Sequence, residues 1–69
     1  MVKGIRNKFL QARTYRDHAE KLRTIADGLT SDQDRNFIAS IASEYERLAN
    51  VAEKQGRVAQ ILEVQTLGL

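Results

Sequence analysis

The chain has 69 residues, a formal net charge of +2, and neither cysteine nor proline. This length limits it to a single domain, 1–69, and the absence of cysteine excludes disulfides and thiolate zinc sites. No apolar run approaches the roughly 20 residues of a membrane-spanning helix. Charged residues interrupt the basic start, where a signal peptide needs a continuous apolar core, so we expect a cytoplasmic protein.

The first half predicts a helix over about residues 5–28. Its apolar residues recur at steps of three and four, a spacing typical of one helix face: Ile5, Phe9, Ala12, Tyr15, Ala19, Leu22, Ala26 and Leu29. We place the start after Gly4, since glycine inside a helix costs about 1 kcal/mol relative to alanine. Gly28 is expected to end the helix in the left-handed conformation.

A turn over about residues 28–31 separates this helix from the next. Thr30 and Ser31 are N-cap candidates, paired with Gln33 or Asp34 three residues later in a capping-box pattern. Because the stop and start signals lie within a few residues of each other, we expect the two helices to be antiparallel neighbours.

The second helix is predicted over about residues 32–65. One apolar seam keeps heptad spacing, and further apolar residues broaden it beyond what a single partner helix covers. Gly56 either ends this helix or is tolerated inside it, and we expect continuation because the apolar pattern resumes after it. The seam comprises Ile38, Ile41, Tyr45, Leu48 and Ala52, broadened by Phe37, Ala42, Ala49 and Val51.

The expected fold class is therefore all-α, an antiparallel two-helix hairpin. An elongated hairpin of this size buries little apolar surface, so we expect it to dimerise into a four-helix bundle with coiled-coil-like packing. Folding the chain about residue 30 also leaves residues 58–67 without a helix opposite. The residues expected at an oligomer interface are Phe37, Ile41, Leu48, Val51, Val58, Ile61 and Leu62.

No pattern in the sequence predicts catalysis, a metal site or a cofactor. His18 is the only histidine and is expected at a helix flank, and Glu44 and Glu46 diverge on a helix instead of forming an acid–base pair. Tyr15 and Tyr45 fall at the same level of the hairpin, which predicts an aromatic pair. We accordingly expect a protein that is not an enzyme and binds no metal or cofactor.

Residues 1–23 carry seven basic side chains and only two acidic ones. Four of the basic residues, Lys3, Arg6, Lys8 and Arg13, form a candidate surface for an anionic partner. Nucleic-acid phosphates and an anionic membrane surface are the two alternatives. The simpler interpretation is a solvated face that pairs with acidic residues of the second helix.

The segment Tyr15–Lys54 resembles small helical proteins of alphaproteobacteria that share the pattern YRxxAExLRxxA, a short turn, and YExLAxxAE. That family has no assigned activity, so the resemblance implies a bacterial helical hairpin and nothing about chemistry. Within the shared pattern, a cross-helix Arg16–Glu46 pair beside the tyrosines is expected to fix the hairpin register. The leading functional hypothesis is a small non-enzymatic, homo-oligomeric interaction or assembly module, whose partner is itself or another protein.

Overall fold

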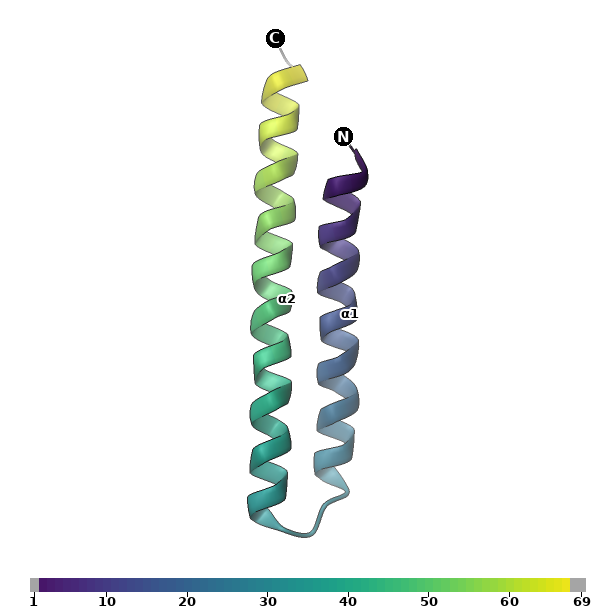
Figure 1. Cartoon of the computed structure of the whole chain (residues 1–69), viewed down its shortest axis with the longest axis vertical. Helices are drawn as coiled ribbons and strands as arrows, with labels where there is room; N and C mark the ends of the chain where they lie inside the picture. Colours follow the sequence, from purple (N-terminus) through teal and green to yellow (C-terminus); the bar gives the residue numbers. More distant parts are fainter. Residues whose placement is uncertain (1, 68–69) are drawn as a thin grey trace.

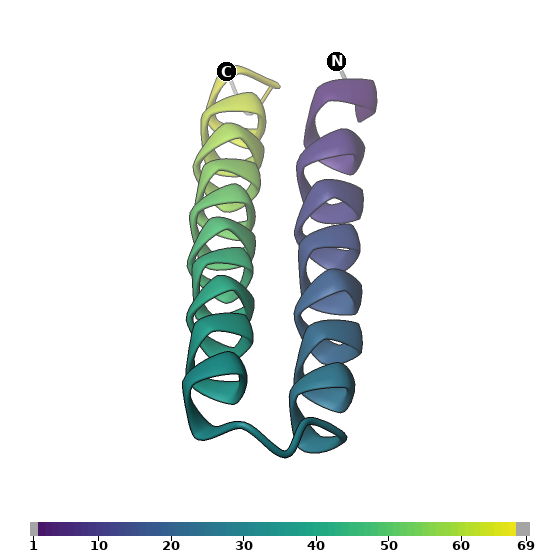
Figure 2. The same ribbon diagram turned by 60° about the horizontal axis from the view of Figure 1, so that its bottom comes forward.

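The computed structural model describes residues 2–67, and the side chains of residues 7–64. Two helices make up this part of the chain, α1 (Val2–Asp27) and α2 (Asp32–Leu67). They run antiparallel, joined by one short turn (Figure 1), and lie side by side along their length (Figure 2). The molecule is elongated, with principal extents of 58 × 14 × 10 Å. The predicted all-helical hairpin is confirmed.

Both helices are longer than predicted. α1 begins at Val2, not at about residue 5, and ends at Asp27. It runs through Gly4 because the glycine penalty of about 1 kcal/mol does not outweigh continued helical hydrogen bonding. α2 passes through Gly56 and ends at Leu67, not at about residue 65.

Ser31 caps the start of α2. Its hydroxyl oxygen accepts a hydrogen bond from the Asp34 backbone N–H at 3.3 Å, and its carbonyl accepts one from the Arg35 N–H at 3.0 Å. Of the two predicted capping-box pairs, the structure shows Ser31 with Asp34, through the hydrogen bond to the Ser31 hydroxyl. This cap satisfies one of the backbone donors that a helix start leaves without an intrahelical partner.

The end of α1 differs from the prediction. No glycine in residues 2–67 has a positive φ, so the left-handed conformation expected of Gly28 is wrong. Instead, the Gly28 N–H donates to the Ile25 carbonyl and the Leu29 N–H to the Ala26 carbonyl, each at 3.1 Å. These bonds span three residues and tighten the last turn, which satisfies terminal carbonyls without a left-handed residue.

The contact between the helices is made of very small side chains. Seven residues are close to two helical turns, so residues repeated at this interval stay on one face. No large side chain is fully buried among the described residues. The buried residues are Ala12, Ala19 and Ala26 on α1, and Ala42, Ala49, Ala52 and Gly56 on α2.

Because this alanine core consists of small residues, the centre of the α2 face that contacts α1 differs from the predicted seam. Ala42, Ala49 and Gly56 lie at seven-residue steps along the centre. Ile41 and Leu48, which the sequence placed in the seam, are only half-buried beside it. Larger side chains are therefore displaced to the two sides of the hairpin, and some face solvent.

Gly56 is buried because α1 crosses close above it. A Cβ at this position would lie 3.1 Å from the Phe9 ring and 3.3 Å from the Lys8 Cβ, closer than ordinary contact distance. Glycine therefore lets the Phe9 ring lie against the α2 backbone.

Gly56 lies opposite Lys8 and Phe9, and this contact shows that the predicted overhang, residues 58–67, is too long. α1 continues six residues beyond Lys8 to Val2, about 9 Å at 1.5 Å per residue. It therefore reaches roughly the level of residues 60–62, and Val58 lies alongside α1. α2 still extends past the start of α1, but by a shorter segment (Figure 1).

Candidate functional site

The hairpin has two unlike sides, because the alanine core displaces larger side chains in two directions. One side carries ion pairs between the helices. Arg23 pairs with Glu46 at 2.6 Å and also contacts the Ser43 hydroxyl at 3.4 Å. Arg16 pairs with Glu53 at 2.9 Å. All of these side chains are partly solvent-exposed, so the ion pairs add little to the stability of the hairpin.

These pairs overturn the predicted Arg16–Glu46 contact. The alanine core sets the levels of the two helices, and at those levels Glu46 lies beside Arg23, one heptad further along α1. Arg16 instead lies beside Glu53, one heptad further along α2, and its guanidinium also donates to the Asn50 side-chain oxygen at 3.3 Å. The sequence predicted the correct residue types, but each of the two residues has its partner seven positions away from the predicted one.

Electrostatics at the Arg23–Glu46 pair favour both charged forms. The hydrogen bond from Arg23 lowers the pKa of the Glu46 carboxyl below its ordinary value, and the positive charge of Arg23 adds to this effect. The same hydrogen bond raises the pKa of Arg23. The pair therefore stays ionised at neutral pH as an exposed structural contact.

The other side of the hairpin is aromatic and apolar. The Tyr15 and Tyr45 ring centroids lie 6.1 Å apart with an interplanar angle of 35°, which confirms the predicted pair. His18 is exposed, as expected for a helix flank, and its ring lies 5.3 Å from that of Tyr45. Such offset rings contribute packing energy along the edge of the alanine core.

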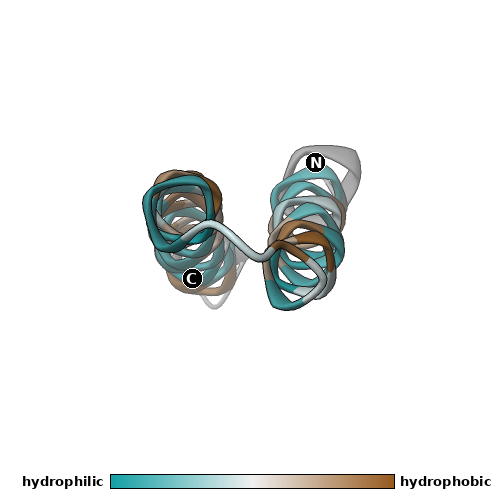
Figure 3. Cartoon of the chain, turned by 90° about the horizontal axis from the view of Figure 1, so that it is seen from below, coloured by the Kyte–Doolittle hydropathy of each residue, from teal (hydrophilic) through white to brown (hydrophobic). Residues whose placement is uncertain are grey.

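A third surface runs along α2, and we name it the outer strip. Its residues follow alternating steps of four and three, the spacing that keeps a seam on one side of a supercoiled helix. Viewed along the hairpin, α2 carries apolar segments beyond those that face α1 (Figure 3). The outer strip consists of Phe37, Ile41, Glu44, Leu48, Val51, Gln55, Val58 and Leu62.

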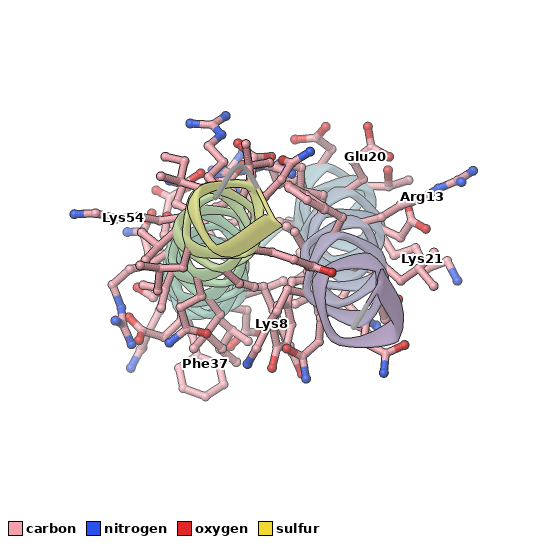
Figure 4. The ribbon with its side chains drawn as sticks, turned by 90° about the horizontal axis from the view of Figure 1, so that it is seen from above. Lys8, Arg13, Glu20, Lys21, Phe37 and Lys54 are labelled. Atoms are coloured by element: carbon pink, nitrogen blue, oxygen red, sulfur yellow. The ribbon has the colours of Figure 1, made fainter. Side chains whose placement is uncertain are left out.

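The outer strip is exposed over most of its length. Phe37 is 65% exposed, Val51 42%, Val58 49% and Leu62 58%, whereas Ile41 and Leu48 are half-buried. Phe37 points to the side of the hairpin opposite Glu20, away from the ion pairs (Figure 4). Toward its C-terminal end the strip contains a shallow groove of about 560 Å³, lined by Val51, Lys54, Gln55, Val58, Ala59 and Leu62.

Six of the seven residues predicted for an oligomer interface lie on the outer strip. Ile61 does not, because one residue along a helix turns by about 100°. It borders a second groove instead, with Arg57, Gln60 and Val64. Glu44 was not predicted as a member of the same strip, although its heptad spacing was readable from the sequence.

The basic residues proposed for an anionic partner are only partly within the described region. The side chains of Lys3 and Arg6 lie outside it. Lys8 is half-buried near Gly56, whereas Arg13 is exposed. The two side chains point to different sides of the hairpin (Figure 4). Lys8 and Arg13 therefore do not converge on a common surface.

The described residues hold no group of three or more His, Cys, Asp or Glu side chains that is able to bind a metal ion. Within the same part of the chain, no charged or polar side chain is buried. Neither described helix is long and apolar enough to cross a membrane. The surface feature left to explain is the outer strip, an apolar seam interrupted by Glu44 and Gln55.

Comparisons with protein-family models, with curated proteins and with solved structures gave no match. The resemblance of Tyr15–Lys54 to small alphaproteobacterial proteins therefore stays a prediction.

Proposed function

We propose that this chain is a small, non-enzymatic assembly module that forms a homodimer through the outer strip of α2, producing a four-helix bundle. The observation that carries this proposal is the outer strip itself. It places six large apolar residues at heptad spacing on one face of α2, and four of them are exposed while Ile41 and Leu48 are half-buried. Exposed apolar seams of this length are typical of association surfaces.

The surface area supports the same proposal. The chain exposes 5526 Å², whereas a compact monomer of this mass exposes about 4,400 Å². The excess is roughly 1,100 Å², comparable to the approximately 800 Å² per partner that a standard interface buries. Association through one face would bring the exposed area of each subunit to that of an ordinary globular protein.

The thin core gives a second reason for association. Alanine methyl groups bury little apolar surface, and each buried methylene-sized group contributes only about 0.8 kcal/mol. A two-helix unit held by alanines is therefore of marginal stability unless its larger side chains are covered as well. Packing the outer strip against a second copy covers them.

Sedimentation equilibrium between about 1 and 100 µM, a range chosen to span typical interface affinities, tests the proposal. The expected result is a species of twice the chain mass. Val51→Asp should dissociate it, because the substitution would bury an unpaired charge in the interface. Ser43→Asp is the matched control, since it adds the same charge on the ion-pair side and should leave the dimer intact. A helical monomer throughout this range would refute the proposal.

A further inference from the structure

We infer that two copies associate with their α2 helices antiparallel, about a twofold axis midway between Leu48 and Val51. This inference rests on the proposed homodimer and adds its orientation and register. The observation behind it is a symmetry in the outer strip. Read outward from that midpoint, the strip has the same order of apolar and polar positions in both directions.

The apolar positions of the strip match across this axis. Leu48 of one copy faces Val51 of the other, and Ile41 faces the partner's Val58. At the ends, Phe37 faces the partner's Leu62. Each match places a heptad seam residue of one helix against a heptad seam residue of the other, as antiparallel coiled-coil packing requires. No apolar residue of the strip is left opposite a polar one.

The two polar positions of the strip match as well. Glu44 of one copy faces Gln55 of the partner, so the Gln55 amide N–H can donate to the Glu44 carboxylate. The carboxylate already accepts from its own Arg47 at 2.6 Å, and Lys54 stands beside Gln55 in the groove. Each Glu44 is then surrounded by three donors, two of them cationic.

A parallel dimer lacks this complementarity. It would place Glu44 against Glu44 of the partner at one level, and like charges held in a seam are unfavourable. Gln55 would meet only another Gln55. The polar pair therefore acts as a register and orientation determinant, the role that single polar seam residues perform in coiled coils.

The proposed twofold axis also passes through the midpoint of α2. α2 runs from Asp32 to Leu67, and the midpoint of this span coincides with the midpoint between Leu48 and Val51. Two antiparallel copies therefore overlap along their whole length. The segment of α2 that extends past α1 then lies beside the first turn of the partner's α2.

The position of α1 leaves room for this arrangement. Leu48 and Val51 lie about a third of a turn around α2 from the Ala42–Ala49 line that contacts α1. The partner's α2 therefore packs next to α1 without displacing it, as neighbouring helices do around a four-helix bundle. Ile41 and Leu48, half-buried in the hairpin, lie at the junction of the two contacts.

The chain has no cysteine, so a single spin label at exposed Ser40→Cys tests the orientation by pulsed dipolar spectroscopy. In the antiparallel register Ser40 is level with Ala59 of the partner, 19 residues away, which is about 28 Å along the axis. A parallel dimer brings the two labels to the same level, about 10 Å apart. The expected distance is about 30 Å.

The outcomes separate the inference from the proposed function. A distance below about 20 Å would leave the homodimer standing and overturn its antiparallel orientation. Loss of the dipolar signal together with a monomeric mass would overturn both.

Two charge-changing variants test the register of the proposed antiparallel dimer. Gln55→Glu places two carboxylates opposite each other at both symmetry-related sites, and it should raise the dimer Kd about tenfold or more. Adding Glu44→Lys creates two opposite-charge pairs in the antiparallel register and should recover most of that loss. A double variant that dimerises no better than Gln55→Glu, with unchanged helical circular dichroism, would overturn the register.

Discussion

Ala49→Leu sets two physical effects against each other at the centre of the alanine core. Ala49 is completely buried and packs with Ala12 and Ala52. By transfer energy alone, the three added methylene-sized groups would stabilise the fold by about 2.4 kcal/mol. The close-packed helix contact has no space for them, so this gain is not realised, and overpacking a filled core gives a net cost of about 1–3 kcal/mol. Since the partner position on α1 is another alanine in a fixed backbone, we expect net destabilisation of about 1–3 kcal/mol.

Urea unfolding followed by circular dichroism, at one fixed protein concentration, measures this difference. Ala39→Leu is the matched control, because Ala39 is only half-buried and lies to one side of the core. It should change the free energy of unfolding by less than about 0.5 kcal/mol. If Ala49→Leu instead raised the unfolding midpoint with the mass unchanged, small side chains would not be what holds the helices at their spacing.

Three further predictions concern the turn and the ion pairs. Gly28→Ala should stabilise the fold by about 0.4–1 kcal/mol, because Gly28 has no positive φ and an added Cβ would meet only the Ile25 carbonyl oxygen at 3.5 Å; thermal unfolding at a lower temperature than wild type would contradict this. Ser31→Ala should cost about 0.5–2 kcal/mol by removing the N-cap, whereas Ser31→Asp should retain most of the stability, as denaturant midpoints will show. Because Arg23 lowers the pKa of Glu46, the pair adds stability above the ordinary glutamate pKa of about 4.5 and loses it as the pH falls through the lowered value. Glu46→Gln should therefore reduce the fall in melting temperature between neutral and acidic pH, and an unchanged fall would exclude this pair as a source of the pH dependence.

Periodicity predicted the coarse architecture correctly. Steps of three and four marked the helices, and the clustered stop and start signals around Gly28 and Ser31 fixed the antiparallel hairpin. The Tyr15–Tyr45 pair followed from that geometry, because residues equally far from a short turn meet across it.

Periodicity did not predict which set of α2 residues, repeated every seven positions, lies at the centre of the contact with α1. Alanine and isoleucine both count as apolar in a pattern, so Ala42 and Ile41 were equivalent in the sequence. Packing distinguishes them, since only small side chains fit between closely spaced helices. The ion-pair register depended on that choice, and for this reason Arg16 was assigned to Glu46 instead of Glu53.

The C-terminus of α1 was mispredicted for a different reason. Glycine permits a left-handed residue but does not require one, and three-residue hydrogen bonds satisfy the same carbonyls. Both endings are compatible with one local sequence, so the sequence pattern alone does not choose between them.

The alanine core also has a consequence for recognising related proteins. Its positions accept only the smallest residues, while the large apolar residues at the sides tolerate exchange among themselves. A relative that keeps this hairpin is therefore identified by two runs of small residues at intervals of seven, at positions 12, 19 and 26 and at 42, 49 and 56. Searches weighted toward large hydrophobic residues will pass over such relatives, because the diagnostic residues are the least distinctive ones in the chain.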